Sequence, residues 1–143
     1  MINGFALMGS FAIFGLLISA WEACMVIGLW RLFEKAGEDG WRAIIPGYNL
    51  YVQYALTWDV NMFWKGLALW GASVVCNWIG GVFHLVGIIA ATGMMAIFAV
   101  GNMKLAEAYG KGMEHTLALI FFYPVGILLL AFGDAQYKYG KEY

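Results

Sequence analysis

The chain has 143 residues, of which 63% are hydrophobic and only 12% are charged. Soluble globular domains contain about 45–50% apolar and about 25% charged residues, so this composition excludes an ordinary soluble domain. The 8 Lys and Arg and the 9 Asp and Glu give a formal net charge of −1. That balance lacks the basic excess of a nucleic-acid-binding protein, and we expect no nucleic-acid partner.

Four runs of the sequence contain no Asp, Glu, Lys or Arg: residues 1–21, 43–58, 66–103 and 115–133. A helix needs about 20 mainly apolar residues to cross the hydrocarbon core of a membrane. Three of the runs reach that length, which predicts an all-α, polytopic membrane helix bundle with about four transmembrane helices. We expect residues 1–143 to form a single integral membrane domain in the inner (cytoplasmic) membrane of a cell.

The first predicted span covers residues 5–30 and is interrupted only by Glu22. No Lys or Arg precedes it, so it lacks the positive region of a secretory signal peptide, and we expect it to be retained. The polar segment that follows contains Gly37 and Gly40, which predict the end of this helix.

The run 66–103 would be about 57 Å long as one helix, nearly twice the thickness of the hydrocarbon core. We therefore predict a helical hairpin with arms at residues 63–76 and 82–104. The break between the arms is predicted at residues 77–81, where Asn77 and the paired glycines Gly80 and Gly81 supply turn chemistry.

A last span is predicted at residues 115–132, and it contains Pro124. Gly110 and Gly112 precede this span and are expected to end the helix before it.

Residues 43–58 form the shortest uncharged run, and Pro46 and Gly47 interrupt it near its start. A run of 16 residues is more typical of a re-entrant or interfacial segment than of a span. Cytoplasmic loops carry the excess of Lys and Arg. If this segment does not span, six of the eight basic residues lie on one side and two on the other; if it does, the division is five to three. We therefore predict four spans with both termini outside, with five spans as the alternative.

Within this segment Asn49, Gln53 and Thr57 recur every four positions and would form one polar stripe on a helix. The favoured interpretation is an interfacial helix whose stripe faces water. The alternative is a stripe that lines a polar cavity, as broken helices do in transporters and channels.

Glu22 is an ionisable residue inside or at the edge of the first span, and such residues are functional candidates. It can lie at the cytoplasmic interface without a partner. If it lies deeper, Lys65 at the base of the next span is the expected partner in a structural salt bridge.

Small residues recur every four positions on two predicted spans: Gly15, Ser19 and Ala23 on the first, and Ala68, Ala72 and Cys76 on the second. This spacing lets helix backbones approach closely in lipid. Packing within the chain is the default interpretation, and self-association in the membrane is the alternative.

The sequence contains no catalytic constellation. Ser10, Ser19 and Ser73 have no nearby His or Lys that could act as a base. His84 and His115 are predicted near opposite membrane surfaces, so they do not form a metal site. We expect no catalytic residue, no metal and no cofactor, and therefore not an enzyme.

The sequence from residue 32 to residue 51 resembles the signature of a family of small bacterial membrane proteins that is catalogued only as a domain of unknown function. The family's Lys-x-Gly, Gly-Trp-x-Ala and Ile-Pro-x-Tyr-Asn-x-Tyr elements match residues 35–37, 40–43 and 45–51. Its Leu-Ala-x-x-Phe-Gly-Lys and Phe-Gly-Asp-Ala-x-Tyr elements resemble residues 105–111 and 132–137. The relatives usually carry a Pro-x-x-Asn turn in the middle hairpin, where Asn77 here lacks the proline.

The resemblance implies a helical integral membrane fold. Some relatives are joined to signal-peptidase-like proteins, but the resemblance assigns no active-site residue to this chain.

We expect a non-enzymatic inner-membrane protein that acts through helix packing, as a homo-oligomer or as an accessory subunit of a larger membrane complex. Its expected partners are the lipid bilayer and either further copies of itself or other membrane subunits. One alternative is a small channel or transporter that uses the polar stripe, and another is an accessory to protein processing or export.

Overall fold

A computed structural model describes the backbone of residues 4–139 and the side chains of residues 8–139. These residues form helices and turns without a strand, so the predicted all-α class is confirmed. The elements in chain order are α1 (Gly4–Lys35), the 3-10 helix η1 (Gly40–Ala43), α2 (Tyr48–Thr57), α3 (Val60–Ile79), α4 (Phe83–Ala108), α5 (Met113–Phe121) and α6 (Tyr123–Phe132).

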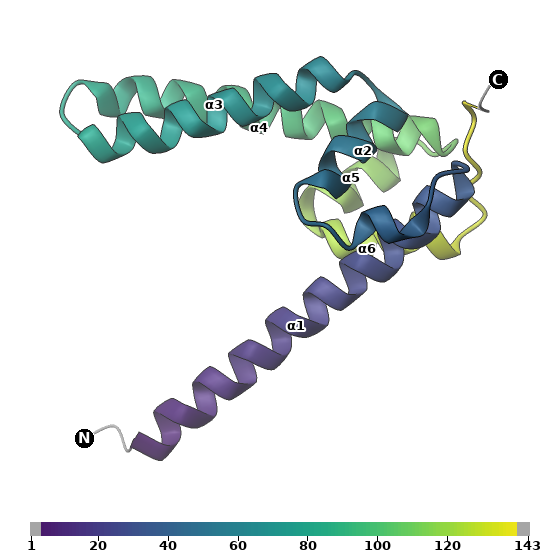
Figure 1. Cartoon of the computed structure of the whole chain (residues 1–143), viewed down its shortest axis with the longest axis horizontal. Helices are drawn as coiled ribbons and strands as arrows, with labels where there is room; N and C mark the ends of the chain where they lie inside the picture. Colours follow the sequence, from purple (N-terminus) through teal and green to yellow (C-terminus); the bar gives the residue numbers. More distant parts are fainter. Residues whose placement is uncertain (1–3, 140–143) are drawn as a thin grey trace.

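Two arms extend from a small helical body (Figure 1). One arm is the N-terminal part of α1, and the other is the antiparallel hairpin of α3 and α4. The body contains the C-terminal ends of α1 and α4 together with η1, α2, α5, α6 and residues 109–112 and 133–139. The largest buried side chains all lie in this body: Leu29, Leu32, Phe33, Asn102, Leu105, Tyr109, Leu119, Ile127 and Leu130.

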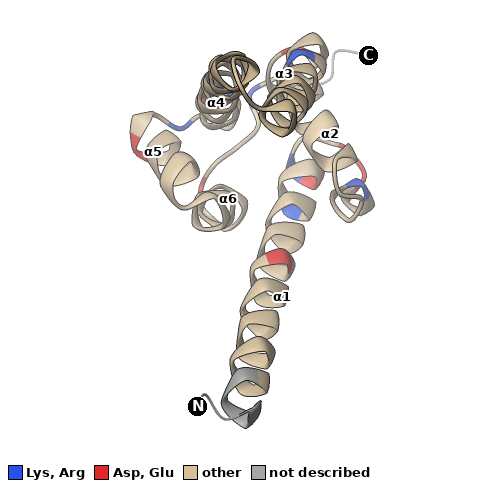
Figure 2. Ribbon diagram, turned by 90° about the vertical axis from the view of Figure 1, so that its left-hand side faces the viewer, with Lys and Arg blue, Asp and Glu red and all other residues tan. Residues whose placement is uncertain are grey.

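Both arms expose apolar side chains. On α1, Phe11 and Leu16 are 75% and 71% exposed, and Trp78 near the tip of the hairpin is 92% exposed. Charged residues gather in the body, and the outer parts of the arms are nearly free of them (Figure 2). Within the described residues, two helical segments are long and apolar enough to cross a membrane, namely Met8–Lys35 and Phe83–Ala108.

Glycines end α1 and α4 with the same motif. Beyond α1, Gly37 has φ 77°, its N–H donates to the carbonyl of Glu34, and the N–H of Glu38 donates to the carbonyl of Phe33. Beyond α4, Gly110 has φ 75° and equivalent hydrogen bonds follow. This pattern is a Schellman motif, in which glycine adopts the left-handed conformation at low cost. Both positions were predicted as helix ends.

The predicted hairpin is confirmed, but α3 continues through Asn77 to Ile79, so the turn is confined to Gly80, Gly81 and Val82. Two glycines of α4 let the helices approach each other. A Cβ added at Gly87 would lie 2.7 Å from Nδ2 of Asn77, and one added at Gly93 would lie 3.3 Å from Cδ1 of Leu69. The contact face of α3 therefore differs from the small-residue face predicted from its sequence.

The last span was predicted as one helix over residues 115–132, but the structure shows two helices there. The helix breaks at Phe122, where φ is −138° and ψ is 65°, and gives the separate helices α5 and α6. Pro124 explains the break, because its ring lacks an N–H and clashes with the preceding turn of a continuous helix. The two helices then pack closely, since a Cβ added at Gly126 would lie 2.7 Å from the backbone nitrogen of Leu119.

The α5–α6 pair begins and ends at the same end of the molecule (Figure 1). α5 begins at Met113, shortly after α4 ends at Ala108. Beyond α6, the N–H of Lys138 donates to the carbonyl of Ala108 at 2.8 Å, and the carbonyl of Gly133 accepts from Lys35, the last residue of α1. The pair is therefore a helical hairpin whose two ends lie beside the C-termini of α1 and α4.

Candidate functional site

The polar stripe lies on α2, as predicted, but it faces the protein. Gln53 and Thr57 are 4% and 7% exposed, so the expectation of a water-facing stripe is wrong. Asn49 is partly buried, and its Nδ2 donates to the carbonyl of Ala43 at 3.4 Å. Buried polar groups require hydrogen-bond partners, and the body supplies them.

Gln53 links α2 to the break between α5 and α6. Its Oε1 accepts a hydrogen bond from the Tyr123 hydroxyl at 2.7 Å, and its backbone carbonyl accepts one from the Thr57 hydroxyl at 2.7 Å. The ring of Tyr123 also lies 5.8 Å from that of Phe98 on α4. Gln53 of α2 thus contacts the chain where its direction reverses between α5 and α6.

The segment from η1 to the first residue of α2 exposes apolar side chains. Trp41, Ile44 and Ile45 are 49%, 55% and 44% exposed, and Tyr48 is 37% exposed. In water, large apolar side chains would tend to lie inward and polar residues such as Gln53 outward. The inverted arrangement is typical of a segment that lies against lipid.

The ammonium of Lys35 closes the body. Its Nζ donates hydrogen bonds to the carbonyls of Leu130 at 2.9 Å, Gly133 at 3.1 Å and Ala135 at 2.9 Å. These carbonyls lie at and just beyond the C-terminus of α6, where the helix leaves acceptors unpaired and carries a partial negative charge. Lys35 therefore neutralises the end of α6 and fixes it to the end of α1.

Two tyrosines strengthen this closure. The Tyr109 hydroxyl donates to the carbonyl of Leu32 at 2.5 Å, which joins the end of α4 to α1. Burial raises the pKa of Tyr109, so its hydroxyl stays protonated and remains a donor. The Tyr137 hydroxyl donates to the carbonyl of Leu56 on α2 at 2.6 Å.

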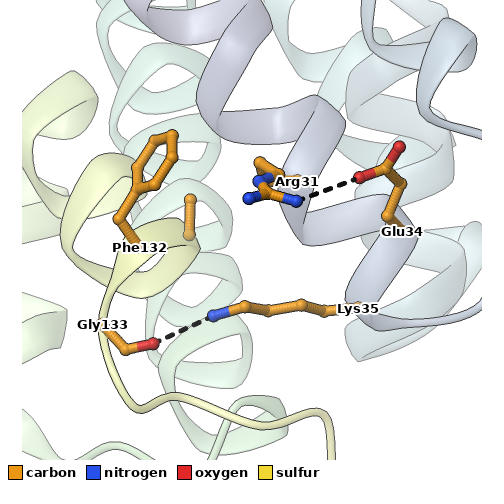
Figure 3. Close-up of a pocket in the computed structure, with 6 residues that line it drawn as sticks. Arg31, Glu34, Lys35, Phe132 and Gly133 are labelled. Atoms are coloured by element: carbon orange, nitrogen blue, oxygen red, sulfur yellow. Dashed lines mark hydrogen bonds and ion pairs between the residues drawn. The ribbon is translucent and has the colours of Figure 1, made fainter.

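A groove lies beside this junction, between α1 and α6 (Figure 3). Its cavity is about 410 Å³, and the lining residues are Arg31, Glu34, Lys35, Ala131, Phe132 and Gly133. The Arg31 guanidinium lies 5.8 Å from the centre of the Phe132 ring, in a cation–π arrangement. Its Nη1 lies 3.8 Å from Oε2 of Glu34. The groove thus combines two cations and one carboxylate with an aromatic wall.

The structure does not pair Glu22 with Lys65. Both side chains are exposed, and neither forms a hydrogen bond or an ion pair with any other described residue. Glu22 lies on the outer part of α1, and Lys65 lies in the second turn of α3. The predicted salt bridge is therefore absent from the described part of the chain.

The predicted small-residue faces do not pack within the chain. Gly15, Ser19 and Ala23 are exposed on α1, as are Ala68 and Ala72 on α3, whereas Cys76 is partly exposed. A Cβ added at Gly15 would meet nothing within 4 Å, and the Ser19 hydroxyl donates to the Gly15 carbonyl of its own helix. The default interpretation of packing within the chain is wrong for the α1 stripe.

Among the described residues, no group of three or more His, Cys, Asp or Glu side chains is placed so that it could hold a metal ion. Cys24 and Cys76 are free thiols on different helices.

These features define an all-helical protein with two helices suited to a membrane and a small body closed by hydrogen bonds. A family model matches residues 41–140, more than two thirds of the chain. The chain therefore belongs to that family, which is described as a family of unknown function (DUF5684). No curated protein and no solved structure matches the chain.

Sequence reasoning missed the residues that make the junction, above all Lys35, Tyr109 and Tyr123. Their hydrogen-bond partners are backbone carbonyls or a side chain 70 or more positions away. It also missed Asn102 on α4, which is 1% exposed and whose Nδ2 has no hydrogen-bond partner among the described residues. Lys35 and Tyr109 lie in the family elements at residues 35–37 and 105–111, which singled out these positions without giving their partners. For Tyr123 the available signal was Pro124, which marks the helix break that brings Tyr123 to Gln53.

Replacement of Lys35 by Met removes the donor of three hydrogen bonds. We expect the free energy of unfolding to fall by about 1–2 kcal/mol, because the variant loses both the charged hydrogen bonds and the interaction of the ammonium with the α6 dipole. Thermal denaturation in mild detergent measures the change. Lys65→Met is the matched control, since Lys65 is exposed and has no partner among the described residues. Equal loss in both variants would contradict the assigned role.

The Gln53–Tyr123 hydrogen bond predicts coupling between the two positions. Tyr123→Phe and Gln53→Leu each leave one buried group unpaired, which costs about 1–3 kcal/mol. The double variant is expected to lose less than the sum of the two, with a coupling energy of about 0.5–3 kcal/mol by denaturation. Tyr48→Phe removes an exposed hydroxyl and serves as the control. Additive losses would show that the two side chains act independently.

Proposed function

We propose that this chain is a non-enzymatic, multi-pass inner-membrane protein that acts by helix packing, as a homo-oligomer or as an accessory subunit of a larger membrane complex. The observation that carries the proposal is the pair of apolar arms, which extend from the body without a covering element (Figure 1). The exposed apolar residues of these arms fit contact with lipid or with the helices of another chain.

For the topology, we propose three spans, formed by α1, α3 and α4, with α5–α6 as a re-entrant hairpin. All seven Lys and Arg of the described residues lie in the body or within two turns of a helix end there: Arg31, Lys35, Arg42, Lys65, Lys104, Lys111 and Lys138. The positive-inside rule then places the body at the cytoplasmic surface. The N-terminal side of α1 would face outside, and residues 133–139 would be cytoplasmic.

This topology revises the sequence-based expectation that both termini lie outside. That expectation depended on a single span at residues 115–132, which the structure replaces by the α5–α6 hairpin. It also divided the basic residues six to two, whereas the revised topology places all the described ones on one side.

The dimensions of α3 support its assignment as a span. Its 20 residues correspond to a length of about 30 Å, which matches the hydrocarbon core. Trp58 precedes the helix at the body and Trp78 lies at its far end. Tryptophans at both ends of an apolar helix are typical of the two membrane–water interfaces.

The channel or transporter alternative receives less support from the geometry. The side chains of Asn49, Gln53 and Thr57 form hydrogen bonds within the protein. Three grooves of about 350–410 Å³ on the described part of the chain are lined by other residues. A role in protein processing or export rests on the family resemblance, and unaltered export in a deletion strain would count against it.

The topology predicts which single cysteines an impermeant maleimide can label from outside intact cells. In a background with Cys24→Ala and Cys76→Ala, Trp78→Cys should be labelled. Gly112→Cys and Tyr139→Cys should be labelled only after the membrane is permeabilised. External labelling of Tyr139→Cys would contradict the re-entrant hairpin and would restore a fourth span.

Assembly is tested by the mass of the purified protein in mild detergent. We expect either a multiple of the 15.8 kDa chain or a complex with a co-purifying membrane protein. Ser19→Leu should weaken the assembly, because Ser19 lies on the exposed small-residue face of α1.

Ser10→Leu is the matched control, since the nine-residue separation places Ser10 on the opposite face of the same helix. A wild-type protein that is a strict monomer with no co-purifying protein would refute the proposal. Equal effects of the two substitutions would remove the α1 stripe from the interface.

A further inference from the structure

The groove between α1 and α6 extends beyond the part lined by Arg31 and Lys35. A second cavity of about 350 Å³ adjoins it and shares Arg31, Glu34 and Phe132 with it. The second cavity adds Val26, Ile27 and Trp30. Because the two cavities share these three residues, we treat them together as the α1–α6 groove, with a basic end and an apolar end.

Arg31 is the cation of this groove that has unused hydrogen-bonding capacity. Its side chain is 59% exposed, and it donates no hydrogen bond to another described residue. Glu34 lies 3.8 Å away, beyond hydrogen-bond distance, and its Oε1 accepts from Nε1 of Trp30 at 2.7 Å. A guanidinium presents a planar fork of donors that fits a phosphate. The groove thus offers an anion a free donor set.

Lys35 adds positive charge to the same end of the groove. Its hydrogen bonds go to three neutral carbonyls, and the Asp134 carboxylate acts on it only electrostatically, without a hydrogen bond or an ion pair among the described residues. With Glu34 as the only acidic lining residue, the lining keeps one net positive charge. The basic end is therefore complementary to an anion.

The apolar end continues in one direction along α1. Ile27 precedes Arg31 by about one helical turn, on the side of the exposed arm. Ile27 and Phe132 are 53% and 59% exposed, which leaves both available for apolar contact. In the proposed topology this direction points into the hydrocarbon core, and Arg31 lies near the cytoplasmic headgroups.

We propose that the α1–α6 groove binds an anionic phospholipid, with the phosphate on Arg31 and an acyl chain along Ile27 and Phe132. The proposal rests on the membrane position proposed above. Basic pockets between membrane helices on the cytoplasmic side bind anionic headgroups. A free phosphate would satisfy Arg31 alone, whereas a phospholipid also covers the apolar end.

The test uses the full chain in a neutral detergent, titrated with phosphatidylglycerol or phosphatidylcholine and followed by native mass spectrometry. We expect wild-type protein to retain phosphatidylglycerol preferentially. Arg31→Gln should weaken this retention about fivefold, the effect of one basic residue at an anionic membrane surface. Arg31→Lys should restore part of it, because it keeps the charge and loses the fork.

Lys65→Gln is the control, because it removes an exposed cation from another helix. Equal retention of the two lipids, an unchanged Arg31→Gln variant, or an equal loss in Lys65→Gln would each overturn the proposal. Displacement of the lipid by millimolar glycerol phosphate would assign the site to free phosphate instead.

Flotation with vesicles made only of phosphatidylcholine separates this proposal from its premise. Protein that floats with these vesicles but shows no preference for the anionic lipid leaves the membrane position intact and refutes the lipid site. Protein that floats with no vesicle refutes the membrane position itself.

Discussion

The contact on which the body depends is the Lys35 ammonium, which binds three carbonyls at the end of α6. Because Lys35 is the last residue of α1, this contact places the ends of α1 and α6 together. The chain must then reverse between α5 and α6, and it does so at Phe122 and Pro124. At that reversal, the Gln53 side chain accepts a hydrogen bond from the Tyr123 hydroxyl. The hydrogen bonds of Lys35 and Gln53 thus hold the C-terminal third of the chain against α1 and α2.

The placement of some polar and apolar side chains of the body supports the proposed position beside lipid. Gln53 and Thr57 face inward, where hydrogen bonds satisfy them, and Ile44 and Ile45 face outward. In water this arrangement would leave apolar area exposed while polar groups were withdrawn from their best solvent. Beside hydrocarbon the same arrangement is favourable, since each polar group needs a partner within the protein.

Local signals in the sequence predicted much of the fold. Gly37, Gly110 and the Gly80–Gly81 turn mark helix ends correctly, because only glycine adopts their backbone conformation easily. These local signals could not predict hydrogen-bond partners that lie far apart in the sequence. The direction of the α2 stripe depends on Tyr123, 70 positions later, and periodicity alone cannot tell a stripe that faces water from one that faces protein. Pro124 was the one local signal that could have corrected the last span.

Lys35 and Arg31 show how one helix can supply two different electrostatic environments. They lie one turn apart on α1, and both face the end of α6 (Figure 3). Lys35 is saturated by carbonyls and therefore serves the fold, whereas Arg31 retains its donors and can serve a ligand. The family match begins at residue 41, after both of them. The matched part of the chain thus contains the carbonyls that need a cation, and the helix that precedes it provides that cation together with a second, unsaturated one.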